Sequence, residues 1–218
     1  MSDIVPARDP ARGIGAVLLA AGRSVRMGGP NKLLIPVAGE PMVRRALCVL
    51  QAVPLAPVVV VLGREPQAVR AALAGLPACT MCEVPEGADQ QVSVDAGLRV
   101  LPEGLDAVLI MLSDQPLLDA DDLRWLVARW RGLPAGSAAI PEFGGQRGNP
   151  VVVDGSMRAP ILAAGPDTGC RGYLAANPQR VHRVTAPNDH FVVDIDTAED
   201  LARLAGRGVR VGGEGAGT

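Results

Sequence analysis

Short aliphatic runs alternate along the chain with segments whose apolar residues recur at helical spacing. The runs at 14–19, 58–62 and 107–112 are almost entirely aliphatic, as expected for strands buried on both faces of a sheet. Shorter apolar stretches predict further strands near 80–84, 138–141, 150–153, 180–184 and 191–193. Because helical segments separate most of these strands, the pattern indicates crossover connections on a largely parallel sheet.

The segments between the predicted strands have helical character. Val94, Leu98 and Leu101 recur at the i, i+4, i+7 spacing of one helix face. Thr197 and Asp200 have the spacing of a capping box, which predicts a helix start at that point. The predicted helices lie at 41–51, 66–75, 91–101, 119–131, 156–164, 171–176 and 198–204.

This pattern predicts one domain over residues 13–205. The chain of 218 residues is long enough for a single α/β core, and no repeat or linker divides it. The flanking stretches 1–12 and 206–218 are polar or glycine-rich and lack apolar periodicity. We therefore expect both ends to be mobile.

Composition narrows the class of protein. Apolar residues make up 48% of the chain and charged residues 20%, which is near the globular average, while 26 Gly and 19 Pro indicate many turns. The net charge of −2 and the small aromatic content argue against a nucleic-acid partner, since few side chains could stack on bases. The aliphatic runs are too short to span a bilayer, and the N-terminus lacks the apolar segment of an export signal. We expect a cytoplasmic protein with no membrane partner.

The four cysteines are best interpreted as structural thiols. Cys79 and Cys82 have the two-residue separation that is found at zinc sites. However, this is a single pair in a chain whose only histidines are His182 and His190. The pair is therefore weak evidence for metal or redox chemistry.

A basic, glycine-containing loop follows the first predicted strand. It spans residues 19–32 and carries Arg23, Arg26 and Lys32. Its small residues would let backbone N–H groups approach an anion closely, as in phosphate-binding loops. It lacks the ending of a Walker A motif, and the glycines of 13–15 precede the strand, so neither common nucleotide motif is present. The loop alone fits phosphate binding and an ordinary basic surface equally well.

Two acidic positions follow predicted strands. Asp114 follows the run at 107–112 after a single residue, Ser113, and Asp194 and Asp196 follow the stretch at 191–193. Ligands of open α/β sheets bind at the carboxyl ends of strands, although a lone Asp there can instead cap the next turn. Carboxylates from two strand ends that face one basic loop suit a magnesium ion and a triphosphate.

Four short sequence motifs occur along the chain in the same order as in a known protein family. They are LAAGRSVRMGGPNKLL from Leu19, SDQPL from Ser113, GNPV from Gly148 and DIDTAEDL from Asp194. Together they resemble the MobA-like nucleotidyltransferases, and among these the molybdenum cofactor cytidylyltransferases. The resemblance covers about residues 14–205 and implies a Rossmann-like α/β/α sandwich with a mostly parallel mixed sheet, of the nucleotide-diphospho-sugar transferase type.

The resemblance also implies a set of nucleotide-site residues. Arg26, Lys32 and Asp114 would be catalytic, and Asp114 and Asp196 would bind Mg²⁺, with Asp194 in reserve. The nucleotide itself would be bound by Leu19, Ala20, Ala21, Gly22, Arg23, Arg26, Lys32, Asp89, Ser93 and Asp114.

The acceptor side of the site is implied by two further motifs. Asn149 stands where many family members have a histidine, and Asp167 and Arg171 lie in a stretch similar to the family's Gly-Asp-x-Gly-x-Arg motif. From the residues alone, Arg171 could equally be part of a polar helix start.

The implied activity is Mg²⁺-dependent transfer of CMP from CTP to a phosphorylated acceptor such as molybdopterin, with release of pyrophosphate. A molybdoenzyme is a candidate recipient of the product. Three alternatives stay open: a guanylyltransferase that uses GTP, a non-catalytic escort for a pterin cofactor, and an oxidoreductase that binds a dinucleotide on the same fold. Asp114 and Asp196 favour catalysis over an escort role, and no GxGxxG motif follows a strand to favour the oxidoreductase.

Overall fold

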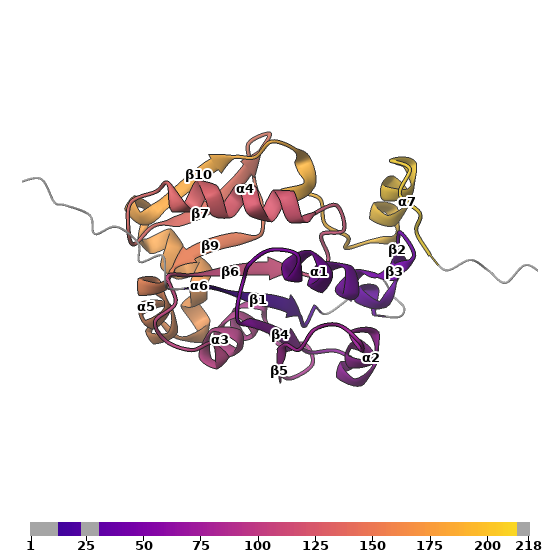
Figure 1. The fold of residues 1–218 in the computed structure, drawn as a ribbon, viewed down its shortest axis with the longest axis horizontal. Coiled ribbons are helices and arrows are strands. Elements are labelled where there is room, and N and C mark those ends of the chain that lie inside the picture. The colour runs from indigo at the N-terminus through magenta and orange to yellow at the C-terminus, as the bar shows by residue number, and fades with distance from the viewer. Residues whose placement is uncertain (1–12, 23–30, 213–218) are drawn as a thin grey trace, which may run out of the picture.

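The predicted α/β fold is confirmed by the computed structural model, which describes residues 13–22 and 31–212 (Figure 1). One large sheet has the strand order β10-β7-β9-β6-β1-β4-β5. All neighbours on this path are parallel except β9, which is antiparallel to both β6 and β7. The strands are β1 (Ile14–Ala20), β4 (Val58–Leu62), β5 (Thr80–Glu83), β6 (Ala107–Leu112), β7 (Ala138–Phe143), β9 (Val151–Asp154) and β10 (Val181–Thr185), and a short β8 (Gln146–Arg147) pairs with β7.

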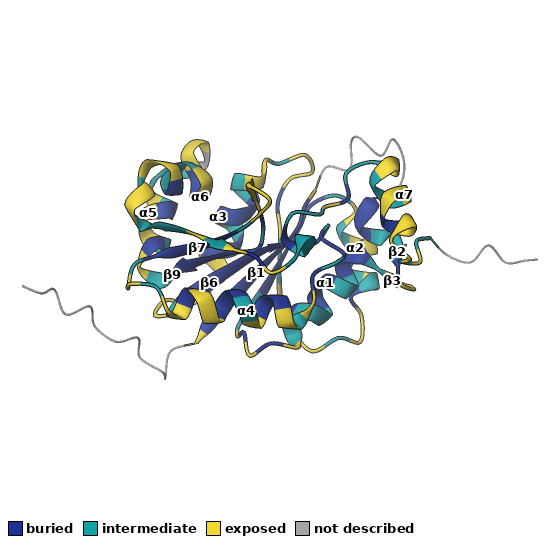
Figure 2. Ribbon diagram, turned by 90° about the horizontal axis from the view of Figure 1, so that it is seen from above, coloured by how far each residue is buried: buried dark blue, intermediate teal, exposed yellow. Residues whose placement is uncertain are grey.

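Helices cover both faces of this sheet, as Figure 2 shows. Alternate side chains of β1 explain why: Ala16 and Leu18 belong to one buried cluster, and Val17 and Leu19 to the other. A strand that is apolar on both faces needs a helical layer on each. The first cluster is covered by α1 (Met42–Gln51), α2 (Pro66–Ala72) and α4 (Ala120–Arg131), and the second by α3 (Gln90–Val100), α5 (Arg158–Ala163) and α6 (Gly165–Ala176).

Close packing of α3 on the sheet depends on Gly97. A Cβ atom at this position would lie 2.4 Å from Val17 Cγ1 and 3.1 Å from Val61 Cγ2. Only a residue without a side chain lets the helix approach β1 and β4 this closely. The start of α3 is thereby fixed near the carboxyl ends of these strands.

A small third cluster lies beyond the carboxyl ends of β1 and β6, where Figure 1 shows α7 (Ala198–Gly206) beside β2 (Pro36–Val37) and β3 (Glu40–Pro41). Val37 forms a bridge with Val211, and both pack in this cluster with Ile195. Residues 209–212, which belong to the stretch that we expected to be mobile, are thus packed against β2, and Gly206 ends α7. The rest of that predicted tail, and the predicted N-terminal segment 1–12, lie outside the described residues.

The strand predicted at 191–193 is wrong. Residues Asp189–Phe191 form a 3-10 turn, η5, in which the Asn188 side chain accepts a hydrogen bond from the backbone N–H of His190. Phe191 is fully buried, and its carbonyl accepts hydrogen bonds from Asn149 and Gln115 instead of from a neighbouring strand. The apolar residues in this stretch are apolar because part of the loop is buried, and they do not form a strand.

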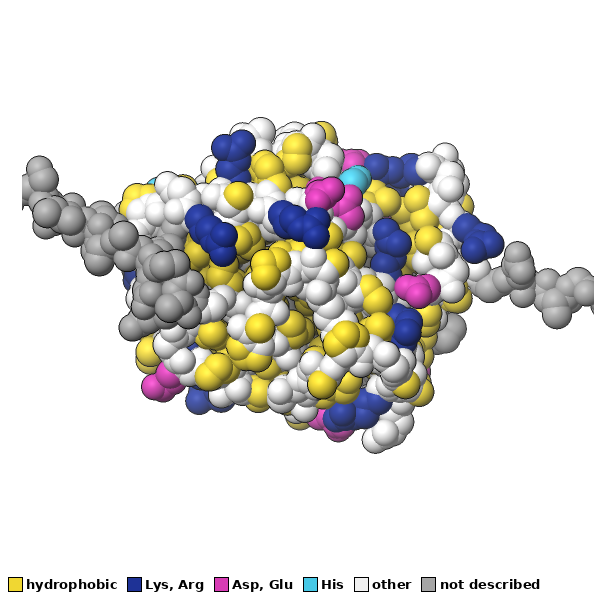
Figure 3. Space-filling model, viewed as in Figure 1, with side chains coloured by type: hydrophobic (Ala, Val, Ile, Leu, Met, Phe, Trp, Pro, Cys, Tyr) yellow, Lys and Arg dark blue, Asp and Glu magenta, His cyan; other side chains and the backbone are white. Residues whose placement is uncertain are grey.

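The outer surface over α1 and α4 is mixed, with Lys and Arg side chains spread singly among apolar and other residues (Figure 3). Within the described part of the chain, no helix is both long and apolar enough to cross a membrane.

The four cysteines are free, and burial raises the pKa values of the Cys79 and Cys82 thiols. Both are therefore protonated at neutral pH, which disfavours a nucleophilic role.

Candidate active site

Lys32 forms the centre of a charged cluster at the carboxyl edge of the sheet. Its side-chain Nζ donates hydrogen bonds to Asp114 Oδ2 at 2.7 Å, to Asp196 Oδ1 at 2.8 Å and to the Ile195 carbonyl at 2.8 Å. Lys32 is only 4% exposed. The structure therefore brings together a predicted phosphate-binding cation and both predicted metal ligands.

Asn31 holds the backbone that carries Lys32. Its side-chain oxygen accepts from the Leu33 N–H at 3.1 Å and caps the 3-10 turn η2 (Lys32–Leu34), while its side-chain nitrogen donates to the Arg64 carbonyl at 3.1 Å. Asn31 is fully buried. We did not predict this role, although Asn is a common capping residue and stands directly before the turn.

Asp114 is held by the ends of two adjacent strands. Ser113 donates through its Oγ to the Leu19 carbonyl at 2.7 Å, which ties the end of β6 to the end of β1. The Asp114 carbonyl in turn accepts from the Ile195 N–H at 3.0 Å. This backbone bond brings the segment with Asp194 and Asp196 to the sheet edge without a strand at 191–193.

The first turn of α7 holds Asp196 from the other side. Asp200 Oδ2 accepts from the backbone N–H groups of Asp196 at 3.0 Å and Thr197 at 2.7 Å, and the predicted capping box is present. Burial opposes ionisation of Asp200, but these N–H donors and the Arg203 side chain outweigh it and hold the pKa at about 2. Asp200 is thus a fixed anion that positions the Asp196 backbone.

The charges of the cluster do not balance among the described residues. Burial would lower the pKa of Lys32, but Asp114 and Asp196 outweigh it and raise the pKa, so Lys32 stays charged. Burial and the like charges of Asp114 and Asp196 raise the pKa of Asp194, with Lys32 acting in the opposite direction. Three carboxylates around one ammonium group create a negative field that suits a cation.

The donor set at this position fits a hard divalent cation. Asp114 Oδ1 is buried and has no hydrogen-bond partner among the described residues, although Oδ2 of the same carboxylate is bonded to Lys32. A buried carboxylate oxygen without a donor is costly unless something else binds it. Oxygen ligands from a few carboxylates are what Mg²⁺ and Mn²⁺ take in proteins.

Comparison with known proteins identifies the family. A model of the MobA-like NTP transferase domain matches residues 16–184. The chain belongs to this family. As a MobA-like protein it is an enzyme of the nucleotidyltransferase class, related to the IspD and GlmU types.

Individual relatives of this MobA-like chain have different names. Nicotine blue oxidoreductase of Paenarthrobacter nicotinovorans is 29% identical over 88% of this chain and 96% of that protein. The 2-C-methyl-D-erythritol 4-phosphate cytidylyltransferase of Streptomyces avermitilis is 32% identical over 90% of this chain and 80% of that protein. Close relatives by sequence therefore include an oxidoreductase as well as a cytidylyltransferase.

Solved structures share the MobA-like fold. Rv0371c from Mycobacterium tuberculosis H37Rv has a TM-score of 0.76 at 24% identity, covering 89% of this chain and 98% of that one. The same protein has also been solved in complex with manganese, with a TM-score of 0.69 at 23% identity, covering 88% and 97% of the two chains. At this identity the likeness shows the fold.

The entrance of the predicted MobA-like nucleotide loop lies beside Lys32. A Cβ atom on Gly22 would be 3.7 Å from Lys32 Cε, so this glycine lies against the lysine side chain. Leu19, Ala20 and Ala21 are buried at the end of β1, and Ala20 packs in the core below α1. Their backbone, more than their side chains, is what they could offer a nucleotide. Arg23 and Arg26 lie outside the described residues.

Asp89 and Ser93 lie at the start of α3. Asp89 is the exposed N-cap residue, and Ser93 is 2% exposed one turn later. Their helix follows β5 and packs against β1 and β4. The two residues are thus on a different element from the Lys32 cluster but at the same edge of the sheet.

Asn149 is linked to Asp114 through the loop at Phe191. The Phe191 carbonyl accepts from the Asn149 N–H at 2.9 Å and from Gln115 Nε2 at 2.8 Å. Gln115 directly follows Asp114 and is 5% exposed. We quoted Gln115 within a motif but gave it no role, and its structural role is to join the Asn149 loop to the acidic strand end.

Asp167 and Arg171 form no hydrogen bond or ion pair with the Lys32 cluster within the described part of the chain. Both are exposed on α6, which packs against α3 and α5 on one face of the sheet. Arg171 lines a pocket with two other arginines. The predicted acceptor residues therefore fall at two places, one beside Gln115 and one on α6.

A second acidic group, at the start of α4, is explained by helix capping. Asp119, Asp122 and His190 place potential metal-ligand atoms within 4.8 Å of one another. However, Asp119 and Asp122 accept each other's backbone N–H groups in a capping box, and Asp122 Oδ2 lies 2.8 Å from His190 Nδ1. These oxygens already have protein partners, in contrast to Asp114 Oδ1.

Proposed function

We propose that this enzyme transfers CMP from CTP to a phosphorylated acceptor, molybdopterin, and releases pyrophosphate. The sequence motifs resemble those of molybdenum cofactor cytidylyltransferases, and a relative at 32% identity is a cytidylyltransferase. A molybdoenzyme is the expected recipient of the product. The proposal goes beyond the family, whose members differ in nucleotide and acceptor.

One observation carries the catalytic part of this proposal. Lys32 lies between Asp114 and Asp196, while Asp114 Oδ1 is buried without a partner among the described residues. A structural ion pair would need no additional acceptor at this point. A site that holds both a lysine and spare carboxylate oxygen suits a triphosphate together with its divalent cation.

Asp114 and Asp196 would hold Mg²⁺, with Asp194 close by. When bound, the ion would neutralise phosphate charge and orient the triphosphate. The residues fit this ion because their donors are carboxylate oxygens, and among the described residues three carboxylates face one ammonium group. Manganese, which a protein of the same fold binds, has the same preference for oxygen ligands.

The protein's own contribution would be alignment and charge compensation. An oxygen of the acceptor phosphate attacks the α-phosphorus of CTP, and the bond from this phosphorus to the bridging oxygen of the β-phosphate breaks. Lys32, which stays protonated, and Arg26 would offset the charge that develops on the departing pyrophosphate. A phosphate acceptor is ionised near neutral pH, so no side chain is needed as a general base.

Substrate recognition would be divided among several elements. Asp89 and Ser93 at the start of α3 would contact the base and ribose, because they lie at the edge of the sheet where β1 has its carboxyl end. Asn149, Asp167 and Arg171 would contact the acceptor. The backbone of residues 19–22, with Arg23, would surround the nucleotide phosphates.

Pyrophosphate release with each of the four ribonucleoside triphosphates tests this function, with and without molybdopterin and with Mg²⁺ or EDTA. We expect release only with Mg²⁺, CTP and molybdopterin together. Release with GTP instead would favour the guanylyltransferase. No release with any triphosphate, from protein that is folded and metal-loaded, would contradict catalysis by this site.

A further inference from the structure

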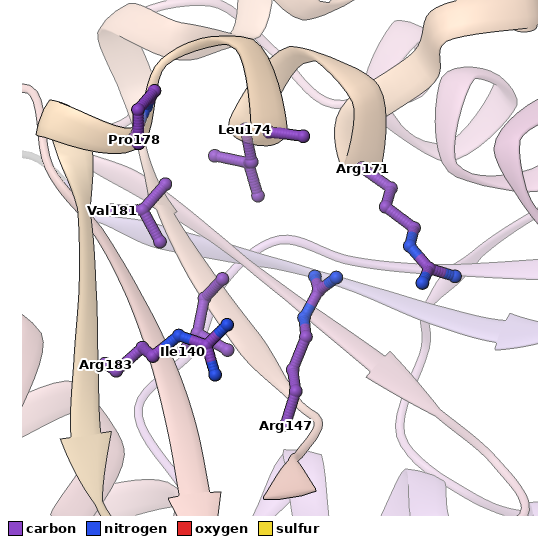
Figure 4. A pocket seen from close by; sticks show the side chains of 8 residues that line it. Ile140, Arg147, Arg171, Leu174, Pro178, Val181 and Arg183 are labelled. Carbon is purple, nitrogen blue, oxygen red and sulfur yellow. The ribbon is translucent and has the colours of Figure 1, made fainter. Parts of the chain in front are cut away.

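Three arginines line one cavity of about 310 Å³ on the α6 face of the sheet. Arg147 extends from β8, Arg171 from α6 and Arg183 from β10. Figure 4 shows the Arg147 and Arg171 side chains entering the space from opposite sides, with Arg183 reaching in from the strand beside them. All three side chains are exposed, so a ligand from solvent can reach them.

Two of these arginines have no acidic partner among the described residues. Arg183 forms an ion pair with Glu142 on the adjacent strand β7. Neither the Arg147 nor the Arg171 side chain has a hydrogen bond or ion pair within the described part of the chain. The pocket therefore contains about two uncompensated positive charges.

The protein keeps these charges together against their mutual repulsion. Desolvation and the nearby charges of Arg171 and Arg183 lower the pKa of Arg147, with only Cys170 acting in the opposite direction. A guanidinium group remains protonated in proteins, so this repulsion persists in the free pocket. A bound anion would relieve it, and guanidinium groups suit phosphate because they can donate paired hydrogen bonds.

The remaining wall of the pocket is apolar. Ile140 and Val181 lie on the adjacent strands β7 and β10, and Leu174 faces them from α6 (Figure 4). An inorganic ion would leave this wall in contact with water. A ligand with an anionic end and an apolar or ring-shaped body would cover it.

The chain connects this pocket to the candidate active site. Arg147 is two residues from Asn149, so their Cα atoms are at most about 7 Å apart. Asn149 shares the Phe191 carbonyl with Gln115, the residue after Asp114. One molecule of moderate size could therefore contact the arginines at one end and approach the Asn149 loop with the other.

We infer that the arginine pocket, formed by Arg147, Arg171 and Arg183, binds a phosphate monoester with an apolar body. A dianion matches the two uncompensated charges better than a carboxylate does. The ligand is the acceptor of the nucleotidyl group, and this last step rests on the proposed function.

Calorimetric titration of the full chain with phenyl phosphate tests the inference, in low-salt buffer with EDTA and no triphosphate. We expect one saturable site that binds phenyl phosphate more tightly than inorganic phosphate or benzoate, because only phenyl phosphate has both the dianion and the apolar body. R147Q and R171Q should each weaken binding at least fivefold. The control R124Q, which changes an exposed arginine on α4 across the sheet, should bind as wild type.

A variant at a different position distinguishes loss of the pocket from a change in folding. A175E places a carboxylate on the lining of the pocket at an exposed helical position, and should block phenyl phosphate as strongly as R147Q does. Unchanged binding in both R147Q and R171Q would overturn the inference, and so would benzoate binding as tightly as phenyl phosphate.

The Mg²⁺·CTP thermal shift separates this inference from the proposed function. R147Q should keep the wild-type shift, because the triphosphate would be held at Lys32. If wild type binds no triphosphate but loses phenyl phosphate in R147Q, the anion pocket stands and its assignment to the acceptor is overturned.

Discussion

A buried lysine and a half-buried carboxylate determine the chemistry of the sheet edge at the residue scale. Lys32 compensates two carboxylates directly, yet Asp114 keeps one oxygen without a donor among the described residues. Burying the lysine is expensive without its partners, and the partners repel one another without the lysine. The stability of the fold and the chemistry of the site therefore depend on the same ammonium and carboxylate groups.

Replacing Lys32 by Met tests this coupling. We expect a loss of about 3 kcal/mol in the free energy of unfolding without metal, because the variant removes the ammonium group that lies between two half-buried carboxylates. The double variant Lys32→Met/Asp114→Asn should recover at least about 1 kcal/mol relative to the sum of the single effects. Urea unfolding at pH 7.5 measures both quantities. Strictly additive effects would show that the contacts at 2.7 and 2.8 Å contribute no interaction energy.

Asp114→Asn tests the catalytic assignment at the same scale. This change keeps the shape of the side chain but removes its charge, so we expect Mg²⁺-dependent pyrophosphate release to fall by about a hundredfold or more with little loss of stability. The matched control is Asp119→Asn, since Asn is an equally good N-cap for α4. Equal loss of activity in the two folded variants would remove Asp114 from the metal site.

At the scale of the element, short capped turns determine the positions of the charged groups to a greater extent than the long strands do. Asn31 caps the turn that carries Lys32, and Asp200 completes the capping box of Thr197 at the start of α7 while it accepts from the Asp196 N–H. Each cap satisfies backbone donors that would otherwise be orphaned at the sheet edge. The site geometry thus depends on residues that do not themselves face a substrate.

The α7 cap should give a measurable pH dependence of stability. The pKa of Asp200 is about 2 in the folded protein, below its ordinary value of 3.8, so its contribution is complete above about pH 5 and is lost as pH falls toward 2. Solvent screening of this surface helix reduces the contribution to about 1 kcal/mol. Asp200→Asn should therefore destabilise the protein at pH 7 and by less at pH 3, measured by urea unfolding. Glu199→Gln, on the same helical turn, should show neither effect, and a pH-independent Asp200→Asn penalty would rule out the charge as its cause.

Elements with strong local signals could be predicted from the sequence, and those determined by burial in a loop could not. The valine-rich run of β4 and the capping box at Thr197 appear where we predicted them. The apolar residues near Phe191 looked like a strand, but they fill the core below a 3-10 turn. The helix predicted at 171–176 corresponds to the part of α6 that follows Gly169, where a φ of +53° breaks the helical backbone, and the part from Gly165 to this kink was not predicted.

At the scale of the whole molecule, the sheet brings distant residues to one edge. Lys32 meets Asp114 across 82 positions of sequence and Asp196 across 164. The acidic motifs allowed us to predict this meeting in outline, because parallel strands end at a common edge. The arginine pocket was not predicted: Arg147 directly precedes the GNPV stretch but was given no role, and no motif surrounds Arg183. Only the pairing of β7 with β8 and β10 brings them together with Arg171.

Nucleotide choice is a property of this assembled edge, and it can be measured on the intact protein. If the start of α3 reads a pyrimidine, Mg²⁺·CTP should raise the melting temperature more than Mg²⁺·GTP at equal concentration, because only a ligand of the native state stabilises it. At a hundredfold excess over its dissociation constant, CTP would add about 2.7 kcal/mol, or about 5–10 °C for a domain of this size. Differential scanning fluorimetry in Mg²⁺ and in EDTA measures both shifts.

Two variants serve as controls for the CTP shift. Asp119→Asn should keep the rise in melting temperature with CTP, whereas Asp114→Asn should lose the part of this rise that depends on Mg²⁺. A larger shift with GTP would make the guanylyl reaction the better assignment, and equal shifts would mean that Asp89 and Ser93 do not discriminate between the bases.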